Sequence, residues 1–497
     1  MDGAVSPDRQ RAARRASSTA PNNAACPTVS AGGPAPRVGR TESGRYTYVV
    51  SDGSRSIRKG TRVAVGLCPT VSDGSRPITL AVALVAVLLL AATALSQPVP
   101  RPTPPRPAAP RQATPEQAPA AAPAPAAVRR TITPPGAPAG RPYSPGVMVG
   151  SSLYISGQLG LPGSGTTPAA MDVQARQAMD GVGAVLKAAG LGYEHLVKCH
   201  VYLADMEDYG AMNAAYASYF KDRVPARTTV QAIALPSNAG VEMSCIAYAD
   251  LAGISVVHPP AGSLPTPLGP YSPAVWAGDT LYLSGMGGQD PVTKTVSDAV
   301  EEQVTQTIAN ITTTVKAAGL SLSDVVSVQA YATRGDETTA LASSLTDALV
   351  RAQRGTPARG LVVLPRLPGA IRAELTAVAV KPAIPRRTAV QQMNDVHAES
   401  TQAGPVLYAA PRAGATGEDA PSQARAAFKA LQQSVKMAGF DWRDVALVHV
   451  YLSDIADLPR VNAVFAEAFP TDPPARVTIQ VHPQGKERIR VGLIAAK

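Results

Sequence analysis

Two stretches of the chain carry an arginine and a glutamate at the same separation. Glu242 follows Arg227 by fifteen residues, and Glu374 follows Arg359 by fifteen residues. In both stretches the arginine ends a Pro-Ala-Arg triplet, and a Leu-Pro pair stands before the glutamate. A buried arginine binds a carboxylate through two parallel hydrogen bonds, and a nearby glutamate orients or deprotonates a water molecule. The pattern predicts a site that holds a small carboxylate and hydrolyses a bond beside it.

The scaffold around these residues recurs three times. In each copy a lysine stands three residues before a glycine, a tyrosine follows in a later segment, and a Pro-Ala-Arg triplet comes last. These lysines, tyrosines and arginines are Lys187, Lys316 and Lys436; Tyr202, Tyr331 and Tyr451; and Arg227, Arg359 and Arg476. The period is about 115 to 130 residues, the size of a domain rather than of a solenoid repeat. We expect three domains, bounded at residues 131–254, 255–383 and 384–497.

Each repeat is expected to be a small α+β unit. In repeat 1 apolar residues recur at helical spacing in two segments and alternate or cluster as in strands in four. The expected elements are strands at 153–156, 199–203, 230–234 and 241–248, and helices at 175–189 and 212–220. Repeat 2 follows the same order. Such a sheet carries helices on one face, and we expect neighbouring repeats to cover the other.

The N-terminal region has a different composition. Up to Arg141 the chain holds 18 basic and 6 acidic residues, whereas the whole chain has a net charge of +10. The repeats therefore carry a net charge of −2, which removes the compositional support for nucleic-acid binding. Residues 1–76 are expected to be a disordered basic tail or the product of a mis-assigned start. Residues 97–130 form a linker rich in proline and alanine.

An apolar run lies within this region. Residues 78–95 contain no charged side chain and are followed by a small-x-small motif at Ala94-Leu95-Ser96. The run is typical of a signal peptide, here bounded at 77–96. It is also close to the minimum length of a membrane anchor. We expect the repeats to be exported to the periplasm or the extracellular space, or to be anchored outside the membrane.

The cysteines and histidines show no metal-binding spacing. Cys199 and Cys245 both fall in strand-like stretches of repeat 1. Buried free thiols are favoured over a disulfide between them. No metal site and no cofactor are expected.

Repeat 1 resembles the Rid (reactive intermediate deaminase) family, also called YjgF-like, over essentially its whole length. Repeat 2 matches more loosely, and repeat 3 matches mainly from Lys436 to Arg476. The matching residues of repeat 1 are Tyr143-Ser144-Pro145, Ser156-Gly157-Gln158, Lys187 to Gly190, Asn213, Tyr219-Phe220, Pro225 to Arg227, Leu235-Pro236 and Glu242.

The resemblance implies a chorismate-mutase-like fold that assembles as a trimer with a cleft between each pair of neighbours. Three copies in one chain are expected to form an intramolecular pseudo-trimer, monomeric in solution. The implied activity is hydrolysis of 2-imino and 2-enamino acids to 2-keto acids and ammonia. Carboxylate binding falls on Arg227 and Arg359, and water activation on Glu242 and Glu374. The implied pocket residues are Tyr143, Ser156, Gly157, Asn213, Thr229, Tyr271, Ser284, Gly285 and Asn462.

Departures from the family pattern point to two candidate sites and one degenerate site. Repeat 2 has Ala342 in place of the asparagine and Leu361 in place of Thr229. Repeat 3 has Ala410-Pro411-Arg412 in place of Ser-Gly-Gln, and its glutamate position falls on Arg490 or Val491. We assume that an arginine and a glutamate of one repeat share a site and that the preceding repeat donates the asparagine. Asn213 is then expected closer to Arg359 than to Arg476.

The chemistry leaves two main functions open. The first is an imine or enamine deaminase that acts on a small carboxylate substrate. The alternative is a binding module that holds a small carboxylate in the clefts without turnover. Ribonuclease action is disfavoured by the charge of −2 on the repeats.

Overall fold

The computed structural model describes residues 128–164, 168–350, 357–389, 400–414 and 417–497. The apolar run at 78–95, the expected tail at 1–76 and nearly all of the linker lie outside these ranges. Within the described residues, no helix combines the length and the apolar composition needed to cross a bilayer.

Each repeat contributes one mixed β-sheet and two helices, which confirms the expected α+β class. The sheet orders are β1-β2-β3-β7-β5-β6, β8-β9-β10-β14-β12-β13 and β15-β16-β17-β20-β18-β19, with β4 and β11 paired to β7 and β14. In each sheet only the last pair of this order is parallel.

The elements of repeat 1 are β1 Arg129–Ile132, β2 Gly146–Val149, β3 Ser152–Ile155, β4 Gln158–Gly160, α2 Met171–Ala188, β5 Leu196–Leu203, α3 Tyr209–Ala217, β6 Ala226–Gln231 and β7 Val241–Tyr248. Those of repeat 2 are β8 Ile254–Val257, β9 Ala274–Ala277, β10 Thr280–Leu283, β11 Met286–Gly287, α4 Val300–Ala317, β12 Val325–Ala332, α5 Thr338–Val350, β13 Ala358–Val363 and β14 Ala373–Val380. Those of repeat 3 are β15 Arg386–Ala389, β16 Ser400–Ala403, β17 Val406–Ala413, α6 Ala420–Met437, β18 Val445–Leu452, α7 Leu458–Ala468, β19 Ala475–Gln480 and β20 Ile489–Ala496.

The first helix of each repeat packs an apolar stripe on its sheet. In α2 this stripe includes Ala175, Met179, Val182 and Leu186, all buried against strands of the same repeat. Each of the three helices ends just before a glycine with a φ between 75° and 79°, namely Gly190, Gly319 and Gly439. Glycine adopts this left-handed conformation without steric cost, so it stops the helix and turns the chain toward the next strand.

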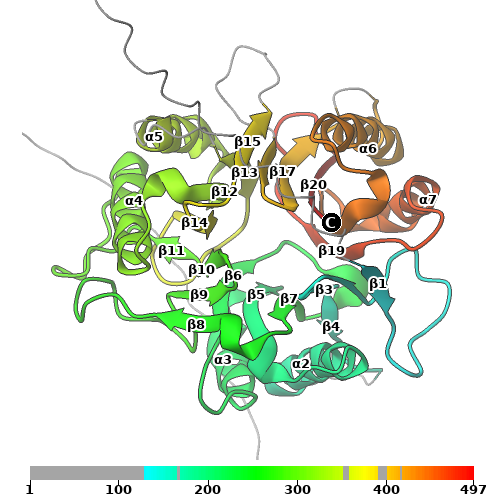
Figure 1. Cartoon of the computed structure of the whole chain (residues 1–497), viewed down its shortest axis with the longest axis horizontal. Helices are drawn as coiled ribbons and strands as arrows, with labels where there is room; N and C mark the ends of the chain where they lie inside the picture. Colours follow the sequence, from blue (N-terminus) through cyan, green and yellow to red (C-terminus); the bar gives the residue numbers. More distant parts are fainter. Residues whose placement is uncertain (1–127, 165–167, 351–356, 390–399, 415–416) are drawn as a thin grey trace, which may run out of the picture. The chain divides into compact units, whose positions relative to one another are not determined.

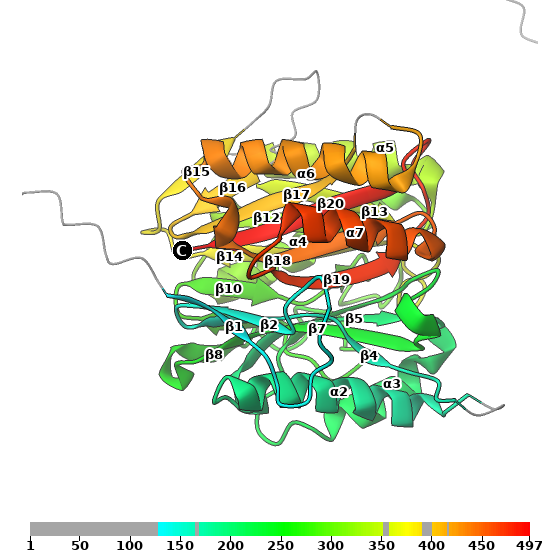
Figure 2. The same ribbon diagram turned by 90° about the vertical axis from the view of Figure 1, so that its right-hand side faces the viewer.

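The inner faces of the three sheets face one another, with the helices outside (Figures 1 and 2). One apolar cluster takes Tyr202 and Val230 from repeat 1 together with residues of both other repeats. The remaining members from those repeats include Tyr331, Val362, Tyr451 and Ile479. Backbone groups at the ends of the edge strands also bond across all three boundaries: Gln231 to Arg366, Ile233 to Gln480, and His482 to Val363. The expected intramolecular pseudo-trimer is confirmed, because each sheet buries the inner face of its neighbours.

Some expected boundaries are wrong. The strand expected at 230–234 is β6, which starts at Ala226, and Ile233 and Ala234 leave the sheet to bond Gln480 of repeat 3. The second helix stops at Ala217, before Tyr219. β8 begins at Ile254 and pairs with β9, so it belongs to the sheet of repeat 2. Contacts between repeats, which a single repeat's pattern does not contain, account for the first of these shifts.

The expectation of free thiols in repeat 1 is also wrong. Cys199 on β5 and Cys245 on β7 are bonded as a disulfide, with Cα atoms 4.1 Å apart. The two residues are direct partners in the antiparallel pairing of these strands. Sequence separation does not reveal this register, because β6 lies between the two strands along the chain.

Candidate functional site

Arg227 sits at the boundary between repeats 1 and 2 with half of its guanidinium unpaired. Its side chain is buried, and Nη2 donates to Asn213 at 2.7 Å and to the Tyr209 hydroxyl at 3.3 Å. Nε and Nη1 are buried and have no hydrogen-bond partner among the described residues. The rings of Tyr216 and Tyr271 lie 4.9 and 5.6 Å from the guanidinium carbon. The guanidinium therefore has two donors available for an anionic ligand.

Repeat 2 supplies the opposite wall. The Arg227 backbone N–H donates to Ser284 Oγ at 2.8 Å, and the Gly285 N–H donates to the Arg227 carbonyl at 2.9 Å. Glu374 lies so close to Gly285 that a Cβ there would overlap its Oε1. A pocket of about 460 Å³ is lined by these residues together with Thr229 and Tyr271. We call this group, Arg227, Thr229, Tyr271, Ser284, Gly285 and Glu374, the 1–2 site.

A matching group lies between repeats 3 and 1. Arg476 donates through Nη1 to Asn462 at 2.7 Å and through its backbone N–H to Ser156 Oγ at 2.8 Å. The Gly157 N–H donates to the Arg476 carbonyl at 2.9 Å, and a Cβ on Gly157 would overlap Glu242 Oε1. The Tyr143 ring lies 4.6 Å from the guanidinium carbon. We call Arg476, Asn462, Thr478, Tyr143, Ser156, Gly157 and Glu242 the 3–1 site.

The assumption that an arginine and a glutamate of one repeat share a site is wrong. Glu242 pairs with Tyr202, which pairs in turn with Val230, three residues beyond Arg227. Since neighbouring residues of a strand point to opposite faces, Arg227 and Glu242 lie on opposite faces of the same sheet. Arg227 faces α3, where Asn213 lies. Glu242 lies on the inner face of the sheet, toward repeat 3, and we call the space enclosed by the three inner faces the barrel. Each arginine therefore meets the glutamate of the next repeat.

The third interface, between repeats 2 and 3, lacks the equivalent groups. Ala410 has no hydroxyl and Pro411 has no N–H, so the two bonds that hold Arg227 and Arg476 have no counterpart. Arg490 is the strand partner of Tyr451, just as Glu242 is the strand partner of Tyr202. Arg490, and not Val491, therefore occupies the glutamate position of repeat 3. Its guanidinium bonds Glu487 and Gln484 and, at 3.4 Å, the Leu361 carbonyl.

Arg359 belongs to this third interface and not to a complete site. Its Nη1 donates to Thr346 Oγ1 at 2.7 Å. Two departures from the family pattern, Ala342 and Leu361, belong to the same repeat as Arg359. The expected number of sites, two with one degenerate, agrees with this geometry, but the composition differs. Arg476 of repeat 3 completes a site, whereas Arg359 does not.

The asparagines also follow a different rule from the one expected. Asn213 bonds the arginine of its own repeat, and so does Asn462. The predicted placement of Asn213 beside Arg359 is therefore wrong. In both complete sites the asparagine oxygen accepts from the guanidinium, so this residue orients the arginine.

Comparison with known proteins agrees with this architecture. The model of the Endoribonuclease L-PSP family matches three times, at residues 135–249, 262–381 and 395–491. The chain belongs to this family. The expected membership in the Rid or YjgF-like group, with three copies in one chain, is thereby confirmed.

Relatives of this L-PSP family chain correspond to one repeat each. The 2-iminobutanoate/2-iminopropanoate deaminase of Mus musculus is 44% identical over 123 residues, which cover 24% of this chain and 91% of that protein. Reactive Intermediate Deaminase A of Arabidopsis thaliana is 40% identical over 108 residues, which cover 21% of this chain and 58% of that protein. The crystal structure of the E. coli YjgF gene product is 26% identical and covers 26% of this chain and 98% of that one, with a TM-score of 0.25.

Both site glutamates of this L-PSP family chain have a pKa raised to the neutral pH range. Burial raises the pKa of Glu374 to about 8, against the opposing charges of Lys198 and Arg227. Burial likewise raises the pKa of Glu242 to about 8, opposed by a 3.4 Å hydrogen bond from the Thr478 N–H and by Arg476. A carboxyl with such a pKa exchanges a proton readily near neutral pH.

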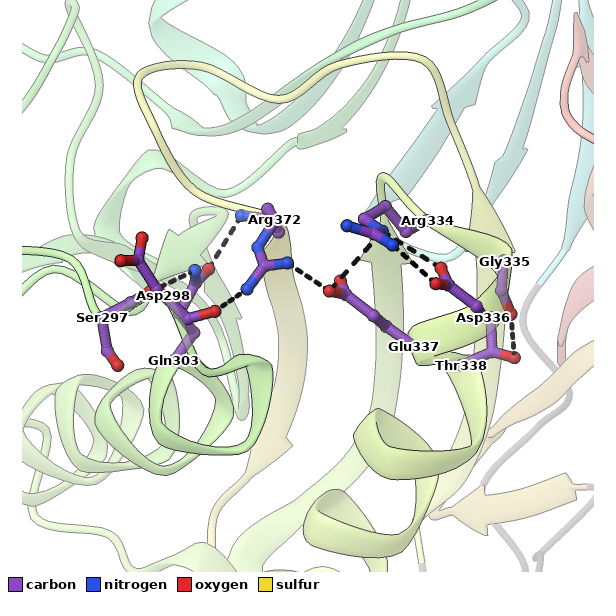
Figure 3. Close-up of polar contacts among 9 residues, drawn as sticks. All are labelled: Ser297, Asp298, Gln303, Arg334, Gly335, Asp336, Glu337, Thr338 and Arg372. Atoms are coloured by element: carbon purple, nitrogen blue, oxygen red, sulfur yellow. Dashed lines mark hydrogen bonds and ion pairs between the residues drawn. The ribbon is translucent and has the colours of Figure 1, made fainter. Parts of the chain in front are cut away.

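The strand that carries Glu374 is anchored at its start by a polar cluster (Figure 3). Arg372, two residues before Glu374, donates from its backbone to Gln303 of α4 at 2.8 Å. Its guanidinium bonds Glu337 and the Asp298 carbonyl, and Glu337 also faces Arg334 at 3.7 Å. These bonds tie the beginning of β14 to the beginnings of α4 and α5, which limits movement of Glu374.

Some members of the sites were not predicted. Tyr209 and Tyr216 surround Arg227, and Arg476 takes part in a complete site. The third Pro-Ala-Arg triplet was the available signal for Arg476. Among the described residues, no group of three or more histidine, cysteine or acidic side chains is placed to hold a metal ion.

Proposed function

We propose that the protein hydrolyses small 2-imino or 2-enamino carboxylic acids to 2-keto acids and ammonia, at the 1–2 and 3–1 sites. The observation that carries the proposal is the buried Arg227 guanidinium, whose Nε and Nη1 lack partners among the described residues, while Arg227 and Glu374 line the same pocket. A carboxylate substrate fits the unpaired Nη1 as the acceptor of a charge-assisted hydrogen bond. The names of the relatives that match one repeat support the same chemistry.

In the proposed reaction each step falls to a residue of the 1–2 site. Arg227 holds the substrate carboxylate, which places the adjacent imine carbon toward Glu374. The carboxylate form of Glu374 takes a proton from water as the water oxygen bonds to the imine carbon, and the protonated Glu374 passes that proton to the imine nitrogen. Glu374 then moves the proton of the carbinolamine hydroxyl to the amine, the C–N bond breaks, and ammonia leaves the keto acid. Near its pKa of about 8, Glu374 serves both as acceptor and as donor of the proton.

The test is ammonia release from a freshly generated 2-imino acid. We expect Arg227→Ala and Arg476→Ala each to remove one site's share of the activity, and the double variant to fall to the uncatalysed rate. Arg359→Ala is the matched control, since it changes the same residue at the third interface, and it should retain activity. Carboxylate binding without ammonia release would instead support the binding module.

We also propose that the repeats work outside the cytoplasm. The Cys199–Cys245 disulfide supports this, because disulfides are rare in reducing compartments. The apolar run at 78–95 supports it too, as a signal peptide or an anchor. N-terminal sequencing of protein from its native host is expected to find a start near Gln97. A mature form that retains Arg55 to Arg76 would indicate an anchor.

A further inference from the structure

A buried lysine joins repeat 1 to the underside of the 1–2 site. Lys198 lies on β5, is 3% exposed and points into the barrel. Its Nζ donates to Thr228 Oγ1 at 2.7 Å, to the Leu283 carbonyl at 2.6 Å and to Thr376 Oγ1 at 2.8 Å. Three acceptors match the three protons of an ammonium group, so the surroundings are built for the charged form.

Two of these acceptors belong to the segments that carry the 1–2 site. Thr376 follows Glu374 by two residues on β14, and both side chains point to the same face of the sheet. Leu283 directly precedes Ser284 and Gly285. The ammonium of Lys198 thus bonds both segments that carry the 1–2 site, beside Glu374 on β14 and beside Ser284.

The 3–1 site keeps the framework but lacks the charge. Ser244 Oγ donates to the Ile155 carbonyl at 2.8 Å, just as Thr376 Oγ1 donates to the Leu283 carbonyl at 3.0 Å. Leu447 occupies in repeat 3 the strand position that Lys198 has in repeat 1, and its side chain carries no ammonium. In the 3–1 site Glu242 accepts a hydrogen bond from the Thr478 N–H. The two sites therefore favour ionisation of their glutamates by different means.

We propose that Lys198 is a positioning residue of the 1–2 site alone, whose ammonium holds Thr376 and the Leu283 carbonyl and favours the carboxylate form of Glu374. The inference rests on the proposed function and adds a residue to it. Removing a positive charge from the surroundings of a buried carboxyl disfavours ionisation of that carboxyl. Burial lowers the pKa of Lys198 to about 7, while Glu374 raises it, so each charge supports the other.

Other titratable groups around Lys198 stay neutral in the relevant pH range. Those that line the same cavity are His200, Tyr282, Tyr331, Tyr408, His449 and Tyr451. Burial lowers the pKa of both histidines and raises that of each tyrosine. A pH effect of Lys198→Met between pH 6 and 9 therefore reports on Lys198, whose own pKa is about 7, and on Glu374.

The first experiment isolates the 1–2 site with Glu242→Gln and measures ammonia release against pH. In this background Lys198→Met should move the acid limb of the rate profile up by about one pH unit. The rate at pH 6 then falls about tenfold while the high-pH plateau is kept. Ser327→Met, the register equivalent at the third interface, is the control and should leave the profile in place. An unmoved limb, or an equal loss at every pH, would overturn the proposal.

The second experiment needs no enzymatic activity, so it separates this inference from the proposed function. The side-chain NMR signal of Lys198 is followed against pH in the wild type, in Glu374→Gln and in the control Glu242→Gln. Because Glu374 raises the pKa of Lys198, Lys198 should titrate at lower pH in Glu374→Gln than in the wild type, and Glu242→Gln should leave its titration in place. Equal Lys198 titrations in the wild type and Glu374→Gln would refute the coupling, whether or not ammonia is released.

Discussion

At the scale of the residue, the buried glutamates combine reactivity with a cost in stability. Glu374 is 5% exposed, and burial raises its pKa from 4.5 to about 8. The folded protein therefore binds the proton more tightly than the unfolded chain does. Stability from this group is complete below about pH 4.5 and is lost as the pH rises through 8.

A neutral substitute is expected to reverse that loss. Glu374→Gln should match the wild type in unfolding free energy near pH 4.5 and exceed it by roughly 2 to 4 kcal/mol at pH 9. The same variant should lose the activity of the 1–2 site, the usual exchange of function for stability. Denaturant unfolding at both pH values measures the difference. A variant less stable than the wild type at pH 9 would show that the ionised carboxylate is stabilised in the fold.

At the scale of the element, the disulfide holds together the two central strands of the first sheet. It closes a loop with a sequence separation of 46 residues, which contains α3 and β6. Repeats 2 and 3 have Val328 and Ala377, and Val448 and Leu493, at the corresponding pairs of positions. The second and third sheets therefore hold the same strand pair by packing alone.

Loss of the disulfide should consequently weaken repeat 1. Replacing Cys199 and Cys245 by valine and alanine, as in repeat 2, is expected to lower the unfolding free energy by about 3 to 4 kcal/mol. Reductant should lower the melting temperature of the wild type and leave that of the variant unchanged. A thiol titration of the unfolded, unreduced protein tests the bond itself: reactive Cys199 and Cys245 would contradict it.

At the scale of the whole molecule, the three repeats cover one another's sheets, so one chain is expected to be sufficient for folding. Each inner face is buried by two neighbours that belong to the same chain. Light scattering should give the mass of a single chain, 51.1 kDa for the full sequence. A stable trimer of chains would show that repeats of different chains assemble instead.

The sequence by itself determined the repeat, the α+β class, the family and most of the residues that line the sites. These follow from local patterns: helical spacing in 175–189, the Pro-Ala-Arg triplets, and the Ser-Gly pairs at Ser156 and Ser284. Tertiary structure alone decided which residues meet. Glu242 is aligned across the sheet with Val230, which lies three residues from Arg227 on β6. This odd offset places Arg227 and Glu242 on opposite faces, so each repeat builds half of two sites. The strand register also joined Cys199 to Cys245, and packing between repeats brought Lys198 to Thr376, because contacts across strands and between repeats leave no periodic signal along one chain.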